Sequence, residues 1–274
     1  GHDDSNIICK DGNYTAELAI TAANASTANA VSSSFVLDTE KPNLMAQIPW
    51  ADFSPDGDGA QDNIPVAITN CTNEKLWTCD VRNAKDLSVK KFNWNGKKSE
   101  LIWDGTDESG NLAKDGKYNL VLYSTDDAGN SFSTEIKNIN LDSRETKVYL
   151  TAKYEEISPN GDNVLESQHI KVSTTVSEGI ATWKFDVRKE DGTSVYSLSE
   201  KDMKNLPAQI TWNGADAKGN ACEGTYLATL ELNYKKGNRV SAVSSGFVCT
   251  ATAPILDVKT APEYFSPDND GVDD

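Results

Sequence analysis

An acidic stretch occurs three times in this chain, and its side chains are of the kind that bind divalent cations. The copies read FSPDGDGAQD (53–62), ISPNGDNVLE (157–166) and FSPDNDGVDD (265–274). In each copy an oxygen donor stands at the first, third and seventh position after the proline. The candidate metal ligands are therefore Asp56, Asp58 and Asp62 in the first loop, Asn160, Asp162 and Glu166 in the second, and Asp268, Asp270 and Asp274 in the third.

The spacing of these donors favours calcium. Residues i and i+2 of an extended loop point the same way, so the first two donors can converge on one ion, and glycines let the backbone turn tightly. Calcium accepts about six to eight oxygens in irregular cages. The pattern is similar to the start of an EF-hand loop but lacks its third acidic ligand and its distant bidentate glutamate. Water, backbone carbonyls or a neighbouring domain would complete the site, and calcium could then stiffen a junction between domains.

The same loops also have a purely structural interpretation. Asp and Asn side chains accept hydrogen bonds from nearby backbone amides and so build tight turns without a metal. In the second loop Asn160 replaces the first aspartate and Asn163 replaces the second glycine, which removes one carboxylate. Three carboxylates so close together would repel one another if no cation were bound. Both interpretations are open at this stage.

The composition excludes several classes of function. The chain carries 42 acidic and 26 basic residues, a formal net charge of −16, which disfavours binding to nucleic acid or to anionic membranes. No run approaches the roughly 18 apolar residues of a membrane-spanning helix, so we expect no direct membrane insertion. The five cysteines and two histidines fit no zinc spacing. Cys71 with Cys79, and Cys222 with Cys249, are compatible with disulfides in an exported protein, and the sequence leaves the pairing open.

Other segments recur at the same intervals as the acidic stretch. Its copies begin at positions 53, 157 and 265, which are 104 and 108 residues apart, and the tyrosines of DGNY, DGKY and EGTY repeat these intervals. Such a period indicates tandem repeats of about 100 residues. We therefore predict four parts: the second half of a truncated repeat at 1–43, complete repeats at 44–143 and 144–252, and the first strand and acidic loop of a further repeat at 253–274.

Within a repeat the pattern predicts β-strands. In WKFDVR (183–188) apolar and polar residues alternate with the period of a half-buried strand, and YNLVLYSTD (118–126) alternates likewise. About seven short strands in about 100 residues, separated by turn residues, indicate an antiparallel sandwich of the immunoglobulin type. The predicted fold class is all-β, with tandem immunoglobulin-like β-sandwich domains in an elongated array. Cys249 takes the place of Leu37 and Leu141 in the aligned repeats, so we expect it to be buried.

The order of the motifs FSPDGDGAQD, WDGTDESGN, DGKY and DDAGN resembles the immunoglobulin-like repeats of large exported bacterial surface proteins, of the spirochaete and Bacteroidetes type. The part from WDG to GKY is similar to the immunoglobulin-like domain of the flagellar hook-capping protein. The acidic motif is similar to one in the C-terminal sorting domains of gliding-associated secretion cargo. The resemblance implies an exported protein at the bacterial cell surface, in the periplasm or outside the cell. It implies neighbouring repeats as partners and no enzymatic activity.

We therefore predict a non-catalytic structural or spacer segment of a large exported surface protein, rigidified by calcium at its acidic loops. Paired carboxylates of a glycosidase occur once, in a cleft, whereas these acids recur in turns, so we expect no enzyme. One alternative is an adhesin or a carbohydrate- or protein-binding module, which would use exposed aromatic rings such as Trp50 and Trp94 to bind a protein or glycan ligand. Another is an accessory region of a large secreted enzyme. Gly1 and His2 look like the remnant of a cleaved tag, so we expect a piece of a longer protein.

Overall fold

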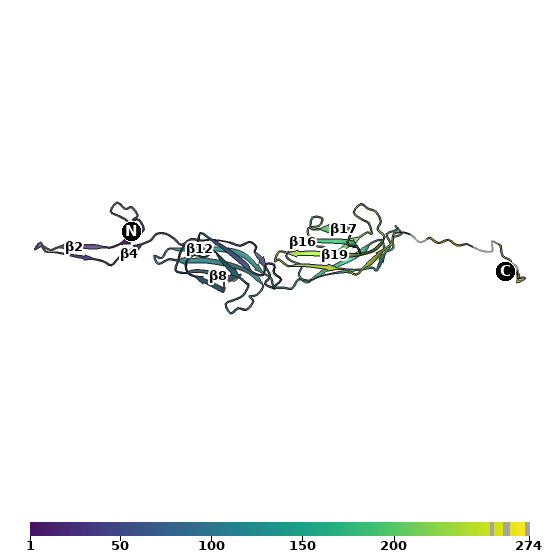
Figure 1. Cartoon of the computed structure of the whole chain (residues 1–274), viewed down its shortest axis with the longest axis horizontal. Helices are drawn as coiled ribbons and strands as arrows, with labels where there is room; N and C mark the ends of the chain where they lie inside the picture. Colours follow the sequence, from purple (N-terminus) through teal and green to yellow (C-terminus); the bar gives the residue numbers. More distant parts are fainter. Residues whose placement is uncertain (253–254, 260–263, 272–274) are drawn as a thin grey trace. The chain divides into compact units, whose positions relative to one another are not determined.

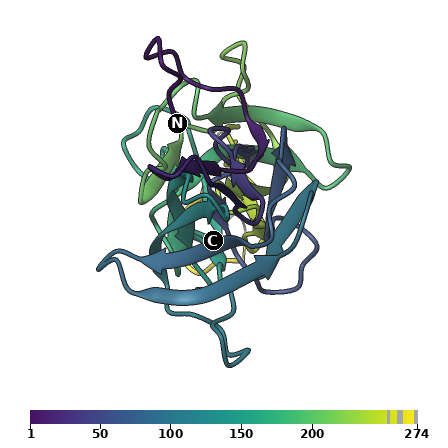
Figure 2. The same cartoon turned by 90° about the vertical axis from the view of Figure 1, so that its left-hand side faces the viewer.

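The regular structure of this protein is entirely β. The computed structural model describes residues 1–252, 255–259 and 264–271, and no helix occurs within these residues. None of them therefore forms a helix long and apolar enough to cross a membrane. The strands are drawn in Figure 1 and, turned by 90°, in Figure 2. The all-β prediction is confirmed. The chain divides into two compact units, Gly1–Glu145 with Tyr234–Asn238, and Thr146–Asn233 with Arg239–Asp274, each of which we describe by itself.

The N-terminal part of the first unit consists of short strands that are paired two by two. The pairs are β1 (Gly12–Tyr14) with β4 (Phe35–Leu37), and β2 (Glu17–Thr21) with β3 (Thr27–Val31). Apolar side chains of these strands, including Leu18, Ile20 and Phe35, are exposed. Two-stranded sheets of this kind do not enclose a core of their own. The boundaries of the four predicted parts stay a prediction.

A sandwich of two sheets follows in the first unit. One sheet has the strand order β10-β7-β5 and the other the order β6-β12-β11-β8-β9. All pairs of neighbouring strands are antiparallel except β6 and β12, which run parallel. The strands are β5 (Met45–Gln47), β6 (Asp52–Phe53), β7 (Ile64–Thr69), β8 (Trp77–Asn83), β9 (Ser88–Trp94), β10 (Glu100–Trp103), β11 (Gly116–Thr125) and β12 (Ser131–Leu141).

The core of this sandwich contains the residues that recur in the repeat. Trp103 begins WDGTDESGN and Tyr118 ends DGKY, and their rings meet edge to face with centroids 5.0 Å apart. Phe53, the first residue of the acidic motif, packs on Trp103 at 5.3 Å. Leu120 and Leu122 follow Tyr118 on the buried face of β11, as the alternation in YNLVLYSTD predicts. Burial of such large side chains is the main favourable term in folding.

The second unit contains a sandwich of the same design. Its sheets have the strand orders β13-β15-β18 and β14-β21-β19-β16-β17, and β20 pairs with β19. The pair of β14 and β21 is parallel, like that of β6 and β12 in the first unit. The strands are β13 (Val148–Ala152), β14 (Glu156–Ile157), β15 (Gln168–Thr174), β16 (Ile180–Lys189), β17 (Ser194–Ser199), β18 (Gln209–Trp212), β19 (Gly224–Tyr234), β20 (Arg239–Val243) and β21 (Phe247–Cys249).

The core of the second unit uses matching residues. Trp212 packs on Tyr226 and on Phe247, with ring centroids 5.2 and 5.9 Å apart. Ile157 takes the place of Phe53 and is fully buried. Cys249 is also fully buried, which confirms the prediction for this residue. All five cysteines are free thiols, so neither of the two disulfides considered above is formed.

A buried aspartate recurs in both sandwiches, in the DVR sequence near the end of β8 and near the end of β16. Asp80 and Asp186 are each only 2% exposed. Asp186 accepts hydrogen bonds from Arg188 at 2.8 Å and from Ser194 at 2.9 Å. Burial by itself raises the pKa of Asp186, but hydrogen bonds, led by those from Arg188 and Ser197, outweigh it and hold this pKa well below its ordinary range.

Asp186→Asn should lower the free energy of unfolding of the protein by about 1–3 kcal/mol at pH 7, because hydrogen bonds to a buried charge are lost. Since folding lowers the pKa of Asp186, its carboxylate stabilises the fold above the unfolded pKa of about 4, and this stabilisation is lost as the pH falls through the folded pKa. Urea unfolding should therefore show a difference between variant and wild type that shrinks from pH 7 to pH 3. The exposed Glu190→Gln is the control and should change little at either pH.

Candidate metal centre

The first acidic loop is fixed at both ends by the sandwich core. It leaves the core at Phe53 and returns at Ile64, and both residues are fully buried. The backbone closes on itself through a hydrogen bond from Ser54 N to Gln61 O at 3.0 Å. Gly57 has a φ of 79°, a value that favours glycine and lets the chain double back. The acidic side chains therefore sit on a short, tightly closed loop.

A second contact holds this loop against the sandwich. Gly105, in WDGTDESGN, has a φ of 79°, and a Cβ atom added to it would lie 3.1 Å from both Pro55 and Leu141. In the second unit Gly214 stands in the same relation to Pro159, where an added Cβ would lie only 2.5 Å from the ring. The glycine of the W-x-G sequence thus provides the space for the proline of the acidic motif. This packing explains why the two motifs recur together.

The three carboxylates of the first loop meet in one place. One oxygen from each of Asp56, Asp58 and Asp62 lies within 4.8 Å of the other two. Among the residues that the structure describes, this is the only group of three acidic, histidine or cysteine side chains that approach one another so closely. The structure thus brings together the three ligands that the sequence predicts for this loop. Their oxygens are of the type and spacing that a calcium ion accepts.

The same carboxylates also accept hydrogen bonds from backbone amides of the loop. Asp62 accepts from Gly57 N and Gly59 N, at 2.7 and 2.9 Å. Asp58 accepts from Ala60 N at 2.7 Å. The loop is therefore a self-supporting turn, as the structural interpretation requires. The two interpretations are compatible, because an ionised carboxylate has about four lone-pair sites and these bonds use only some of them.

The turn Tyr234–Asn238, which joins β19 to β20, lies against this loop within the first unit. Asn238 Nδ2 donates hydrogen bonds to Asp56 Oδ2 at 2.6 Å and to Asp58 Oδ2 at 3.0 Å. Gln61 Nε2 donates to the backbone carbonyl of Lys235 at 3.0 Å. The acidic cluster thus has a polar neighbour from a distant part of the sequence.

Sequence reasoning missed Asn238. It lies 180 residues from Asp58, so no local spacing connects the two. The available signal was the repeat itself, because Asn130 ends DDAGN at the matching position, 108 residues earlier. Both asparagines follow a glycine in a tight turn between two strands. A search for oxygen donors in turns that recur with the same period would have found the pair.

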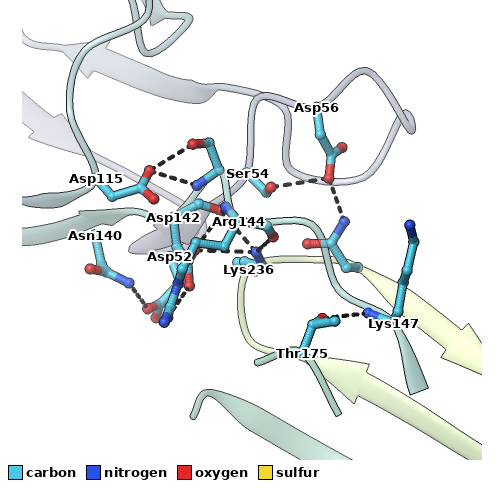
Figure 3. A network of polar contacts seen from close by, with 12 residues as sticks. Asp52, Ser54, Asp56, Asp115, Asn140, Asp142, Arg144, Lys147, Thr175 and Lys236 are labelled. Carbon is cyan, nitrogen blue, oxygen red and sulfur yellow. Dashed lines mark hydrogen bonds and ion pairs between the residues drawn. The ribbon is translucent and has the colours of Figure 1, made fainter. Parts of the chain in front are cut away.

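Lys236, in the same turn, is 4% exposed. Its positive charge is compensated by acceptors in the residues that follow β12. Its Nζ donates to the carbonyls of Asp142 and Arg144, at 3.0 and 2.6 Å, and lies 3.4 Å from Asp142 Oδ1 (Figure 3). The side chain of Arg144 is the main cause that lowers the pKa of Asp142 to about 2; burial opposes this, and Lys236 adds to the lowering. Three acceptors thus hold one buried ammonium group.

In the second acidic loop the predicted ligands form a hydrogen-bonded turn with two carboxylates. Asp162 accepts from Val164 N at 2.7 Å, and Glu166 accepts from Asn163 N at 3.0 Å. Asn160 Nδ2 donates to Asp162 at 3.2 Å. At the first position the second loop therefore has the neutral amide of Asn160, where the first loop has the carboxylate of Asp56. The second loop carries less negative charge for this reason.

In the third acidic loop only part of the predicted ligand set falls within the described residues. Asp268 accepts from Asp270 N at 3.4 Å, and Asp268 N donates to Ser266 O at 2.8 Å. Asp274 lies outside the described residues. Asp268 and Asp270 therefore resemble the start of the first loop, and their role as ligands stays a prediction.

The tryptophans considered for ligand binding are packed against the core. Trp50 and Trp94 are both partly buried against the core of the first unit. Trp50 Nε1 donates to Asn63 O at 3.0 Å. The ring of Trp94 stacks on that of Trp77, with centroids 6.1 Å apart and planes 13° apart. Packing within the sandwich therefore holds both rings, and the alternative in which they are exposed for ligand binding is not supported.

Comparison with known proteins gives similar folds and no family. No family model matches the chain, and no curated protein matches it. A tetra-tandem repeat from the extending region of a large adhesion protein is 14% identical, with a TM-score of 0.35, and the match covers 91% of this chain and 59% of that one. Fibronectin(III)-like modules of CbhA from Clostridium thermocellum are 18% identical, with a TM-score of 0.36 and coverage of 79% and 100%. A Ca2+-stabilized adhesin with which an Antarctic bacterium binds ice is 16% identical, with a TM-score of 0.32 and coverage of 87% and 56%.

Identities and TM-scores of this size carry no functional conclusion for this chain. This chain spans only 59% of the length of the first of these structures. The sandwich architecture described above rests on the strands and cores of the chain itself. The finer resemblance to the hook-capping protein and to sorting domains stays a prediction.

Lys236→Met should raise the pKa of Asp142 from about 2 towards its ordinary value of about 3.9, because a nearby positive charge is removed. It should also lower the free energy of unfolding of the protein by about 1–3 kcal/mol, since the carbonyls of Asp142 and Arg144 lose their charged donor. Carboxyl-carbon NMR titration and urea unfolding measure the two effects.

The neighbouring Lys235 provides the matched control. Its side chain is exposed, and only its backbone carbonyl contacts Gln61, so Lys235→Met should change neither quantity. An unchanged pKa of Asp142 in Lys236→Met would mean that the ammonium group does not occupy this place in solution.

Proposed function

We propose that this chain is a non-catalytic structural segment of a large exported bacterial surface protein, and that the first acidic loop binds calcium. The observation that carries the proposal is the convergence of three carboxylates within 4.8 Å on a loop anchored in the sandwich core. Like charges at this separation repel, and a divalent cation removes that repulsion. In this proposal the partners of the segment are neighbouring repeats of the same protein.

Two features support a structural role. The residues that recur with the repeat period are core aromatics, close-packed glycines and turn aspartates, so the repetition preserves architecture. The buried thiols are unsuited to nucleophilic catalysis. Burial, with a smaller effect of Asp80, raises the pKa of Cys79 to about 12, and burial, with Cys222, raises the pKa of Cys249 to about 11. A thiol must ionise to attack, and these two stay protonated at neutral pH.

Calcium would act on the stiffness of the first unit. The cation would take oxygens from Asp56, Asp58 and Asp62, whose loop also contacts the turn Tyr234–Asn238. Binding to the folded form alone raises the free energy of unfolding and reduces motion of the loop and the turn. Calcium sites in extracellular modules have dissociation constants on the order of 10⁻⁴–10⁻³ M, and we propose that this loop lies in that range.

The other two loops would bind calcium differently. In the second loop, Asn160, Asp162 and Glu166 offer two carboxylates and one amide, so we propose weaker binding there. In the third loop, Asp268, Asp270 and Asp274 offer three carboxylates, as in the first. Binding of calcium by the isolated chain would thus be dominated by the first loop, where the cluster is already assembled.

Calorimetric titration of the metal-stripped protein with calcium should show saturable binding, and the melting temperature should be higher in calcium than in chelator. At a calcium concentration one hundred times the dissociation constant, the free energy of unfolding should rise by about 2.7 kcal/mol. Asp58→Ala should abolish binding at the first loop, because it removes a central ligand.

Asp107→Ala is the matched control for loss of a turn aspartate. Asp107 accepts backbone hydrogen bonds from Ser109 N and Asn111 N, both at 2.9 Å, but lies outside the acidic cluster. Its removal should lower stability without changing calcium affinity. Absence of heat and of any shift in melting temperature at millimolar calcium would show that FSPDGDGAQD is only a self-supporting turn. Unchanged affinity in Asp58→Ala would show that the ligand set is wrong.

A further inference from the structure

We infer that Asn238 is a reversible fourth ligand of the calcium site. Its side-chain amide rotates by a half-turn when the cation binds. Without calcium its nitrogen faces Asp56 and Asp58 as a hydrogen-bond donor. With calcium its oxygen faces the ion. This inference rests on the proposed function, since it names a ligand and a movement at the same site.

The first support is that Asn238 is buried and only half satisfied. The residue is 6% exposed, and its Nδ2 donates to Asp56 Oδ2 at 2.6 Å and to Asp58 Oδ2 at 3.0 Å. Its Oδ1 is buried and has no hydrogen-bond partner among the residues that the structure describes. A buried acceptor without a partner is unfavourable, so this amide has a strong acceptor that no protein group uses.

The second support is the symmetry of the amide group. A half-turn about the terminal bond of the side chain exchanges oxygen and nitrogen and leaves the shape of the group almost unchanged. After this turn Oδ1 would lie next to Asp56 Oδ2 and Asp58 Oδ2. Three oxygens would repel one another there unless a cation lay between them. The orientation of the amide is therefore coupled to the presence of the ion.

The third support is that the backbone around Asn238 is shaped to reach the loop. Gly237 has a φ of 103°, and a Cβ atom added to it would lie 2.5 Å from the carbonyl oxygen of Ala60. The turn is closed by a hydrogen bond from Tyr234 N to Asn238 O at 2.9 Å. Only glycine permits this approach. The contact holds the amide at the acidic cluster whether or not the ion is bound.

The resulting ligand set fits calcium better than magnesium. Three carboxylates and one neutral amide oxygen leave room for water in a shell of about six to eight oxygens, and the irregular arrangement suits a large flexible cation. Magnesium requires near-ideal octahedral geometry, and a loop fixed at Phe53 and Ile64 has little freedom to provide it. We therefore expect Asn238 to add affinity for calcium and little for magnesium.

Calorimetry on the whole chain, with calcium as the probe, tests the role of Asn238. Asn238→Ala should weaken calcium binding about tenfold, comparable to the loss of one well-placed polar ligand. Asn238→Asp should bind calcium more tightly than wild type, because it adds a fourth carboxylate to the site. In chelator it should melt at a lower temperature than wild type, because no cation then offsets the repulsion among the four carboxylates. The matched control is Asn130→Ala. In the corresponding turn, Asn130 donates to Asp38 O at 3.1 Å and to Asp126 Oδ2 at 2.9 Å, away from the cluster, so calcium affinity should not change.

A measurement on the unaltered protein covers the case in which a variant does not fold. The side-chain amide nitrogen and proton signals of Asn238 should shift on addition of calcium, as the hydrogen bonds to Asp56 and Asp58 are lost, and the Asn130 signals should stay in place. If wild type binds calcium but neither the Asn238 signals nor the affinity of Asn238→Ala changes, the inference is overturned and the proposed function stands. If wild type binds no calcium, both are overturned.

Discussion

Repulsion among the carboxylates of the first acidic loop is the constraint around which this part of the protein is arranged. Every hydrogen-bond partner that the described structure gives to the carboxylates of Asp56, Asp58 and Asp62 is a donor: backbone amides of the loop, the hydroxyl of Ser54 and the amide nitrogen of Asn238. Neutral dipoles reduce the repulsion but leave the charge in place. On a chain with a net charge of −16, neutralising that charge is more favourable than it would be on a balanced surface.

The loop can hold these charges because its ends are part of the hydrophobic core. Phe53 packs on Trp103, and Pro55 packs on Gly105, so core burial stabilises a backbone that electrostatics alone would open. The second unit repeats the arrangement with Ile157, and with Pro159 packed on Gly214. The scaffold of the loop is therefore retained in both units, while its charge differs. The charge of the acidic loop can thus change while its scaffold stays the same.

The sequence predicts well whatever depends on local spacing. The alternation in WKFDVR predicts a strand, and the i, i+2 spacing of Asp56 and Asp58 predicts their convergence. Burial of Asp186 could not be predicted, because a charged residue in an alternating strand is expected to face solvent, and only Arg188 and the serines of β17 make its burial possible. Asn238 was missed because its link to the loop is purely tertiary. Whether Trp94 is packed or exposed could not be decided from the sequence, because a single ring gives no periodic signal.

The cysteines of this protein contribute to its cores as thiols. No covalent bridge supports either sandwich, and four of the five thiols are buried within or beside the strands. Neither sandwich therefore depends on a disulfide for its stability. A reducing medium has no disulfide to break in either sandwich. The two sandwich cores are therefore held by packing and hydrogen bonding and not by thiol oxidation.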